Sequence, residues 1–189
     1  MPDLTVEPTS VAQWQGLVRT AGEACDTRLE EPVEAYVVFM LMRFSEHTAL
    51  GRDALAIRWL EGMQTAGERS GGERLRATGD ECLLICGLFP QRVRRRALPF
   101  SYYVRLGRGA YHTLAHSGAA DDSGPYDELA RGFVSLMELL QAMRDPDPEA
   151  ALQAGDAAAL ARQTGSRRAW DRVAPGNVTL LDPDRQRRN

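Results

Sequence analysis

The sequence of 189 residues contains no lysine, so all 23 of its basic residues are arginine. Enzymes that form a Schiff base use a lysine amine, and the Walker-type phosphate-binding loop also requires a lysine. Both classes of protein are therefore excluded. The formal net charge of −3 also provides no overall basic field of the kind that holds nucleic acid.

Long apolar runs are also missing. The longest, Ala35 to Met42, is far shorter than the roughly 20 residues that span a bilayer. The first residues, MPDLTVEPTS, lack the basic and then apolar segments of a secretory signal. We therefore expect no membrane association and a cytoplasmic location. The odd number of cysteines (Cys25, Cys82 and Cys86) agrees with reduced thiols in that compartment.

The remaining composition is typical of a globular protein, with 43% apolar and 26% charged residues. Apolar residues recur at helical spacing along most of the chain, and alternating strand patterns are scarce. We therefore predict an all-α fold, a bundle of about six main helices followed by short C-terminal helices. Residues 1–173 are expected to form a single helical domain, and residues 174–189 an extended arm or flexible tail.

The apolar spacing, capping residues and prolines predict where the helices lie. The expected main helices cover residues 10–26, 33–46, 54–63, 73–88, 101–115 and 126–144. The segments 33–46 and 74–88 are apolar on most sides, so we expect them to form the centre, with Phe39 and Leu84 in the core. Trp170 is the expected anchor of the C-terminal helices.

A dense stretch in the middle of the chain carries small and aromatic residues in the order GDxxL, GLFP, YY and GxxAY. Its members are Gly79, Asp80, Leu83, Gly87, Leu88, Phe89, Pro90, Tyr102, Tyr103, Gly107, Ala110 and Tyr111. This order resembles a bacterial family of helical proteins of unknown function. The resemblance covers about residues 30–170 and is specific only in its centre. It implies an all-helical cytoplasmic fold and no established activity.

Two pairs of metal-binding residue types lie near the same stretch. Cys82 and Cys86 are four residues apart, as are His112 and His116, so each pair shares a helical face. Two sulfurs and two nitrogens would suit tetrahedral zinc. The cysteines, however, belong to an apolar run and the histidines to a polar side. We therefore interpret the cysteines as core residues and the histidines as solvated, and predict no metal site.

Motifs for covalent catalysis or cofactor binding are not found. The sequence lacks the G-x-S-x-G elbow of hydrolases. The GRG at residues 107–109 lies in a helical pattern, without the preceding strand that a dinucleotide-binding loop requires. Gly107 and Ala110 instead indicate close packing between helices. We therefore assign no catalytic residue and predict no cofactor.

Asp80 interrupts an apolar helical pattern, so its carboxylate requires a partner. Arg43 closes the most apolar segment, and a buried Asp80–Arg43 pair joined by the hydroxyl of Tyr103 or Tyr111 would satisfy these groups. A surface pair with Arg76 is one alternative. Another is that Asp80 is a catalytic acid or base in a pocket. Asp80, Arg43, Tyr103 and Tyr111 form the candidate ligand-binding set.

Four arginines, Arg92, Arg94, Arg95 and Arg96, lie between Pro90 and Pro99. We expect a short helical turn or loop that exposes guanidinium groups. The groups would pair with nearby carboxylates, or bind an anion or an acidic partner. The negative charge of the chain makes specific nucleic-acid binding the weakest of these alternatives.

Three functions remain open. The first is a non-catalytic helical interaction protein that binds an unknown protein or itself, for example as a homodimer. The second is a small-molecule-binding protein, or an enzyme, with a pocket of tyrosine, aspartate and arginine. The third is an anion or nucleic-acid binder that uses the arginines of residues 92–96. An exposed apolar patch would favour the first function. A polar-lined pocket would favour the second, and a basic surface stripe the third.

Overall fold

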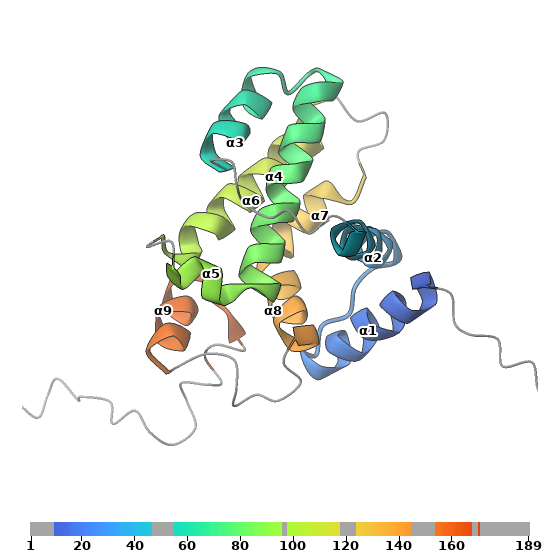
Figure 1. Cartoon of the computed structure of the whole chain (residues 1–189), viewed down its shortest axis with the longest axis vertical. Coiled ribbons are helices and arrows are strands. Elements are labelled where there is room, and N and C mark those ends of the chain that lie inside the picture. The colour runs from blue at the N-terminus through green and yellow to red at the C-terminus, as the bar shows by residue number, and fades with distance from the viewer. Residues whose placement is uncertain are drawn as a thin grey trace, which may run out of the picture.

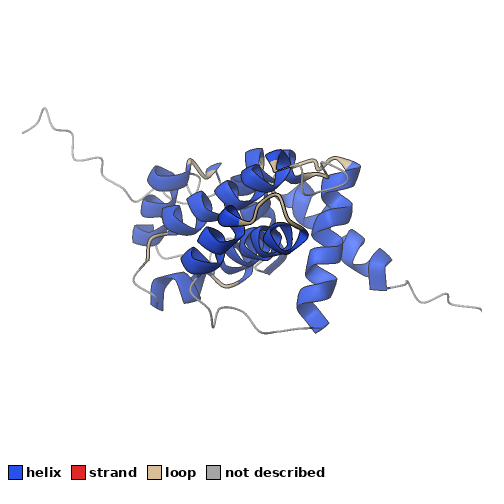
Figure 2. Cartoon of the chain, turned by 90° about the horizontal axis from the view of Figure 1, so that it is seen from above, coloured by secondary structure: helices blue, strands red, loops and turns tan. Residues whose placement is uncertain are grey.

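The computed structural model describes residues 10–46, 55–95, 98–117, 124–144, 154–167 and 170. These residues form helices and no strand, so the predicted all-α fold is confirmed (Figures 1 and 2). The helices are α1 (Ser10–Ala24), α2 (Glu31–Glu46), α3 (Leu55–Gln64), α4 (Arg69–Leu88), α5 (Pro90–Arg95), α6 (Phe100–His116), α7 (Tyr126–Arg131), α8 (Phe133–Arg144) and α9 (Ala154–Thr164). None of these described helices combines the length and apolar character needed to cross a bilayer.

Helix α4 occupies the centre of the core. Every residue from Thr78 to Gly87 is buried, which confirms the expected central position of this segment. Helices α3, α6 and α8 pack around it (Figure 1). The helix ends before Pro90, because a residue that precedes proline is pushed out of the helical conformation. The buried apolar core continues from Val18 of α1 to Ala161 of α9.

Small residues allow α4, α6 and α8 to approach closely. A Cβ atom at Gly107 of α6 would lie 2.5 Å from the ring of Phe133 and 2.9 Å from Cβ of Cys82. A Cβ atom at Gly87 of α4 would lie 2.5 Å from Cβ of Leu140. Both distances are shorter than carbon–carbon contact allows, so the glycines accommodate neighbouring side chains. The interpretation of Gly107 as a packing residue is confirmed.

Helix α2 differs from its predicted role. It lies to one side of α4 and is seen nearly end-on in Figure 1. One face of α2 buries Val37, Val38 and Leu41, but Phe39 is 59% exposed. The prediction that Phe39 belongs to the core is wrong, because the other helices cover only part of this apolar helix.

Three helical boundaries also differ from the sequence-based expectations. Helix α4 begins at Arg69, four residues before the expected start at residue 73. The expected helix 126–144 is interrupted at Gly132, so that α7 packs along α6 while α8 contacts α4 and α1. Trp170 is 47% exposed, so its predicted role as an anchor is wrong. The predicted tail, 174–189, lies outside the described residues.

Candidate functional site

Asp80 lies on α4, where its carboxylate faces α2 and α6. The residue is only 8% exposed. Its Oδ2 accepts a hydrogen bond of 2.7 Å from Nη2 of Arg43, which confirms the predicted ion pair. Its Oδ1 accepts hydrogen bonds from the hydroxyls of Tyr36 (2.6 Å) and Tyr111 (2.8 Å). Side chains from α2 and α6 therefore converge on one carboxylate of α4, and we call these four residues the Asp80 network.

Three tyrosine rings surround this network. Tyr36 of α2 meets the rings of Tyr111 and Tyr126 edge-on, at centroid distances of 6.3 and 5.7 Å. Tyr111 and Tyr126 stack at 6.3 Å. Such aromatic pairs add to the free energy gained by burial and limit the movement of each ring. The hydroxyls of Tyr36 and Tyr111 are therefore held in position to donate to Asp80.

The electrostatics of the Asp80 network follow from its burial. Burial raises the pKa of the Asp80 carboxyl, although the hydrogen bonds of Tyr36 and Tyr111 and the charge of Arg43 oppose this shift. Burial and the charge of Asp80 raise the pKa values of Tyr36 and Tyr111 well above their usual range. Both hydroxyls therefore stay protonated and remain donors at neutral pH. The geometry favours the structural pair over a catalytic carboxyl, because both carboxylate oxygens already have partners.

The predicted ligand-binding set is brought together only in part. Asp80, Arg43 and Tyr111 are in direct contact, whereas Tyr103 does not donate to Asp80 and instead packs its ring on Tyr102 at 5.3 Å. The side chain of Arg43 is 44% exposed, so the ion pair is buried only on its acidic side. The sequence interpretation missed Tyr36. Its position two helical turns before Arg43 places both on one side of α2, which is a signal that the sequence contains.

The remaining predicted residues lie apart from the Asp80 network. Cys82 and Cys86 are buried in the core, and His112 and His116 are exposed with their rings stacked 4.4 Å apart. Their predicted difference in environment is confirmed. Within the described segments, no cluster of histidine, cysteine and acidic side chains has the arrangement of a metal site.

The predicted arginine cluster lies partly on α5, which confirms a short helical turn after Pro90. Arg92 is exposed, and its guanidinium lies 5.2 Å from the centroid of the Phe89 ring. Such a distance allows a cation–π contact. The side chains of Arg94 and Arg95, and the whole of Arg96, lie outside the described part of the chain.

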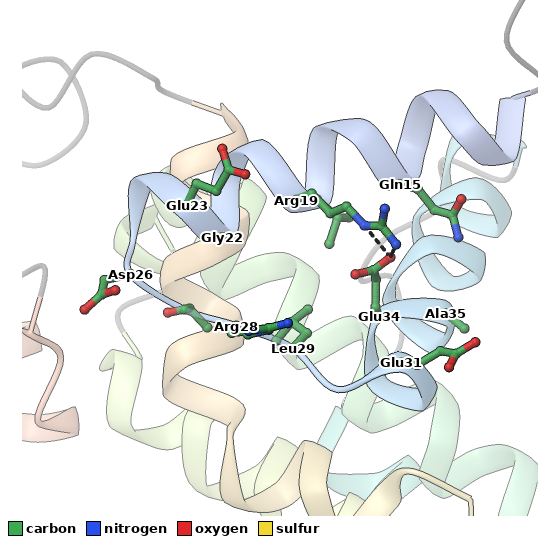
Figure 3. Close-up of a pocket in the computed structure, with 12 residues that line it drawn as sticks. Gln15, Arg19, Gly22, Glu23, Asp26, Arg28, Leu29, Glu31, Glu34 and Ala35 are labelled. Atoms are coloured by element: carbon green, nitrogen blue, oxygen red, sulfur yellow. Dashed lines mark hydrogen bonds and ion pairs between the residues drawn. The ribbon is translucent and has the colours of Figure 1, made fainter.

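A pocket of about 910 Å³ lies between α1, the connection that follows it and the start of α2 (Figure 3). Sequence reasoning did not predict this α1–α2 pocket, because its residues come from helix faces with no recognisable motif. Its lining residues include the acidic Glu23, Asp26, Glu31 and Glu34, the basic Arg19 and Arg28, and the apolar Val18, Leu29 and Ala35. Four acidic and two basic groups give the lining an excess of negative charge.

One ion pair crosses the α1–α2 pocket. Nη2 of Arg19 on α1 lies 2.9 Å from Oε1 of Glu34 on α2 (Figure 3). The Arg19 side chain is 66% exposed, whereas that of Glu34 is 15% exposed. Exposed ion pairs contribute little free energy, so another cation can replace Arg19 at modest cost. Nε of Arg19 also donates to Oε1 of Glu34, at 2.9 Å, so Glu34 is a sheltered carboxylate whose basic partner is largely exposed.

Comparison of the chain with protein-family models, curated proteins and solved structures finds no match. The resemblance to a bacterial helical family therefore stays a prediction. The physical properties of the α1–α2 pocket and the Asp80 network are the basis for a functional assignment.

Proposed function

We propose that this protein is a non-catalytic helical interaction protein that binds a basic, amphipathic helix of a partner in the α1–α2 pocket. The exposed apolar side chain of Phe39 on α2, together with the excess of acidic residues in the pocket lining, supports this proposal most directly. Complementary charge selects partners and speeds their encounter, so an acidic pocket favours a basic segment. The volume of the pocket, about 910 Å³, is sufficient for several side chains of such a helix.

Glu34 is the expected anchor for a cationic side chain of the partner. A guanidinium or ammonium group that replaces Arg19 would pair with a carboxylate that is already largely shielded from water. A partner cation that becomes shielded from water on binding would make a stronger charge-assisted hydrogen bond than the exposed Arg19 side chain makes. Arg19 would return to solvent, where an arginine side chain is well hydrated.

Apolar surface beside the carboxylates supports an amphipathic partner. Leu29 and Ala35 are partly exposed in the pocket lining, whereas Val18 is 1% exposed and offers almost no surface. Phe39 follows Ala35 by one turn on the same side of α2 and is exposed, so it extends the apolar surface along the helix. A helix with basic residues flanking an apolar stripe would cover both parts.

Two further properties belong to the proposal. All three cysteines are thiols, which supports a reducing, cytoplasmic location.

A second copy of the chain is the alternative occupant of the pocket. A dimer of the unaltered protein that Glu34→Gln converts to a monomer would identify this homodimer in place of a separate partner.

The proposal is tested by fluorescence anisotropy with two labelled helical peptides of equal length, one of leucine and lysine and one of leucine and glutamate. We expect saturable binding of the basic peptide and none of the acidic peptide. Glu34→Gln should weaken binding of the basic peptide by about tenfold, since a charge-assisted hydrogen bond contributes roughly 1.5–3 kcal/mol.

A matched control separates the pocket from general electrostatic attraction. Glu73→Gln removes the same charge from an exposed position on α4, where Glu73 pairs with Arg69 on the same helix. We expect this variant to bind the basic peptide like the parent protein. Equal losses in Glu73→Gln and Glu34→Gln would show that the α1–α2 pocket is not the binding site.

A further inference from the structure

A second arginine accompanies Arg43 at the Asp80 network. Arg76 precedes Asp80 by one turn on α4, so both side chains lie on the same side of the helix. The Arg76 charge is close enough to lower the pKa values of Asp80 and Tyr36, although burial raises both overall. Burial also raises the pKa of Tyr126, and the Arg76 guanidinium beside it opposes that shift. The half-buried side chain of Arg76 therefore lies near both Asp80 and Tyr126.

The charges in this region do not balance. Asp80 is paired with Arg43, and Arg76 forms no ion pair with a carboxylate of the described residues. Arg76 is also half-buried, as is Tyr126. One carboxylate thus faces two guanidinium groups, which leaves a single excess positive charge in partly desolvated surroundings. Arg76 hydrogen-bonds Tyr126, and its remaining N–H groups gain free energy when an anion supplies a carboxylate partner.

We propose that Arg76, Arg43 and Tyr126 form a binding site for the carboxylate group of a small-molecule ligand. The single excess charge matches one carboxylate. The planar guanidinium fork fits the two oxygens of a carboxylate, and the Arg43 side chain is 44% exposed, so N–H groups that do not bind Asp80 are accessible. The ring of Tyr126, packed on Tyr36 and Tyr111, provides an aromatic wall next to the two cations.

This site is separate from the α1–α2 pocket, because none of its residues lines that pocket. Asp80 has a supporting role. Its ion pair with Arg43 and its hydrogen bonds to Tyr36 and Tyr111 hold α2, α4 and α6 together beneath the site. The Asp80 network thus fixes the positions of the helices that carry Arg43 and Arg76.

The test uses sodium acetate as the probe, with acetamide as a neutral molecule of the same shape, at constant ionic strength. The arginine Nε–Hε resonances of the intact chain are followed by NMR. We expect acetate to shift the Arg76 signal in a saturable manner and acetamide to leave it unchanged. Arg76→Gln should weaken acetate binding about tenfold, measured on the Arg43 signal, because it removes a charged hydrogen-bond donor.

Arg74→Gln is the matched control, since Arg74 lies two residues away on α4, has a side chain that is 47% exposed, and lies 4.0 Å from a carboxylate oxygen of Glu61. Its acetate affinity should equal that of the parent. Should Arg76→Gln fail to fold, Arg76→Lys retains the charge without the fork and is expected to bind acetate several-fold more weakly. Unsaturable shifts, equal effects of the Arg74 and Arg76 variants, or tighter binding of inorganic phosphate than of acetate would overturn the assignment.

Discussion

The ring of Tyr111 on α6 lies directly against Gly79 on α4. A Cβ atom at position 79 would approach Cε1 of this ring to 2.5 Å. The next residue, Asp80, accepts the hydrogen bond of the Tyr111 hydroxyl at 2.8 Å. Adjacent residues of the Gly-Asp motif therefore have complementary roles, because the first makes room for the tyrosine and the second binds its hydroxyl.

Substitution of Gly79 by alanine should destabilise the protein. The added methyl group would push the Tyr111 ring away from α4 and strain its hydrogen bond to Asp80, at a cost of about 1–3 kcal/mol. Gly16 is the control, because no atom lies within 4 Å of a Cβ atom placed there. Gly16→Ala should stabilise α1 by up to about 1 kcal/mol. Urea unfolding of both variants measures the difference, and a Gly79→Ala variant as stable as the parent would contradict the close contact.

Loss of the Tyr111 hydroxyl should affect stability more than loss of the Tyr126 hydroxyl. Tyr111→Phe retains the buried ring but removes a hydrogen bond to a carboxylate, for an expected cost of roughly 1.5–3 kcal/mol. The half-buried hydroxyl of Tyr126 hydrogen-bonds the Arg76 guanidinium and not Asp80, so Tyr126→Phe should cost less, about 0.5–1.5 kcal/mol. Thermal and urea denaturation compare the two, and equal losses would argue against a specific role for Tyr111.

The loss of stability on replacing Asp80 should depend on whether the new side chain can accept hydrogen bonds from the hydroxyls of Tyr36 and Tyr111. Asp80→Ala leaves the hydroxyls of Tyr36 and Tyr111 without their acceptor, and each unsatisfied group costs about 1–3 kcal/mol. Asp80→Asn keeps an accepting oxygen, and Arg43 is exposed enough to be rehydrated, so the loss should be smaller. This account would be refuted if chemical denaturation showed the asparagine variant to be less stable than the alanine variant.

Asp80 should also make stability depend on pH. Because burial raises its pKa in the folded protein, the native state retains a proton that the unfolded chain releases near pH 3.9, about the ordinary value. The contribution of Asp80 to the free energy of unfolding therefore falls as pH rises through the folded pKa. The stability of the parent minus that of Asp80→Asn should decrease over this range and become constant above it. Urea unfolding at several pH values checks the sign, and a difference that grows with pH would mean a lowered pKa.

One aliphatic and one aromatic truncation test the difference in burial between a residue of α4 and a residue of α2. Leu84 is 4% exposed, so Leu84→Ala should cost about 2–5 kcal/mol through lost burial and a cavity. Phe39→Ala should change stability by less than about 0.5 kcal/mol, because its ring is exposed in the folded protein. The same substitution should weaken binding of the basic peptide in the anisotropy experiment. A large loss of stability in Phe39→Ala would restore the predicted core position.

Several features of the candidate sites follow from sequence alone. A carboxylate inside the buried pattern of 74–88 requires a partner, and Arg43 at the end of an apolar helix is a suitable one. The choice between Tyr103 and Tyr111 is not determined in this way, since both lie on one side of α6. Tyr111 binds Asp80 because Gly79 lies opposite its ring, a relationship between two helices that spacing along one helix does not contain.

The sequence by itself determined the helical class, the central place of residues 74–88 and the need to satisfy Asp80, because apolar periodicity and the cost of buried charge act locally along the chain. Tertiary structure alone decided that Phe39 is exposed, that Tyr36 joins the Asp80 network and that a charged pocket forms between α1 and α2. The reason is that periodicity reports how apolar a helix is, whereas the packing of its neighbours decides which of its faces is covered.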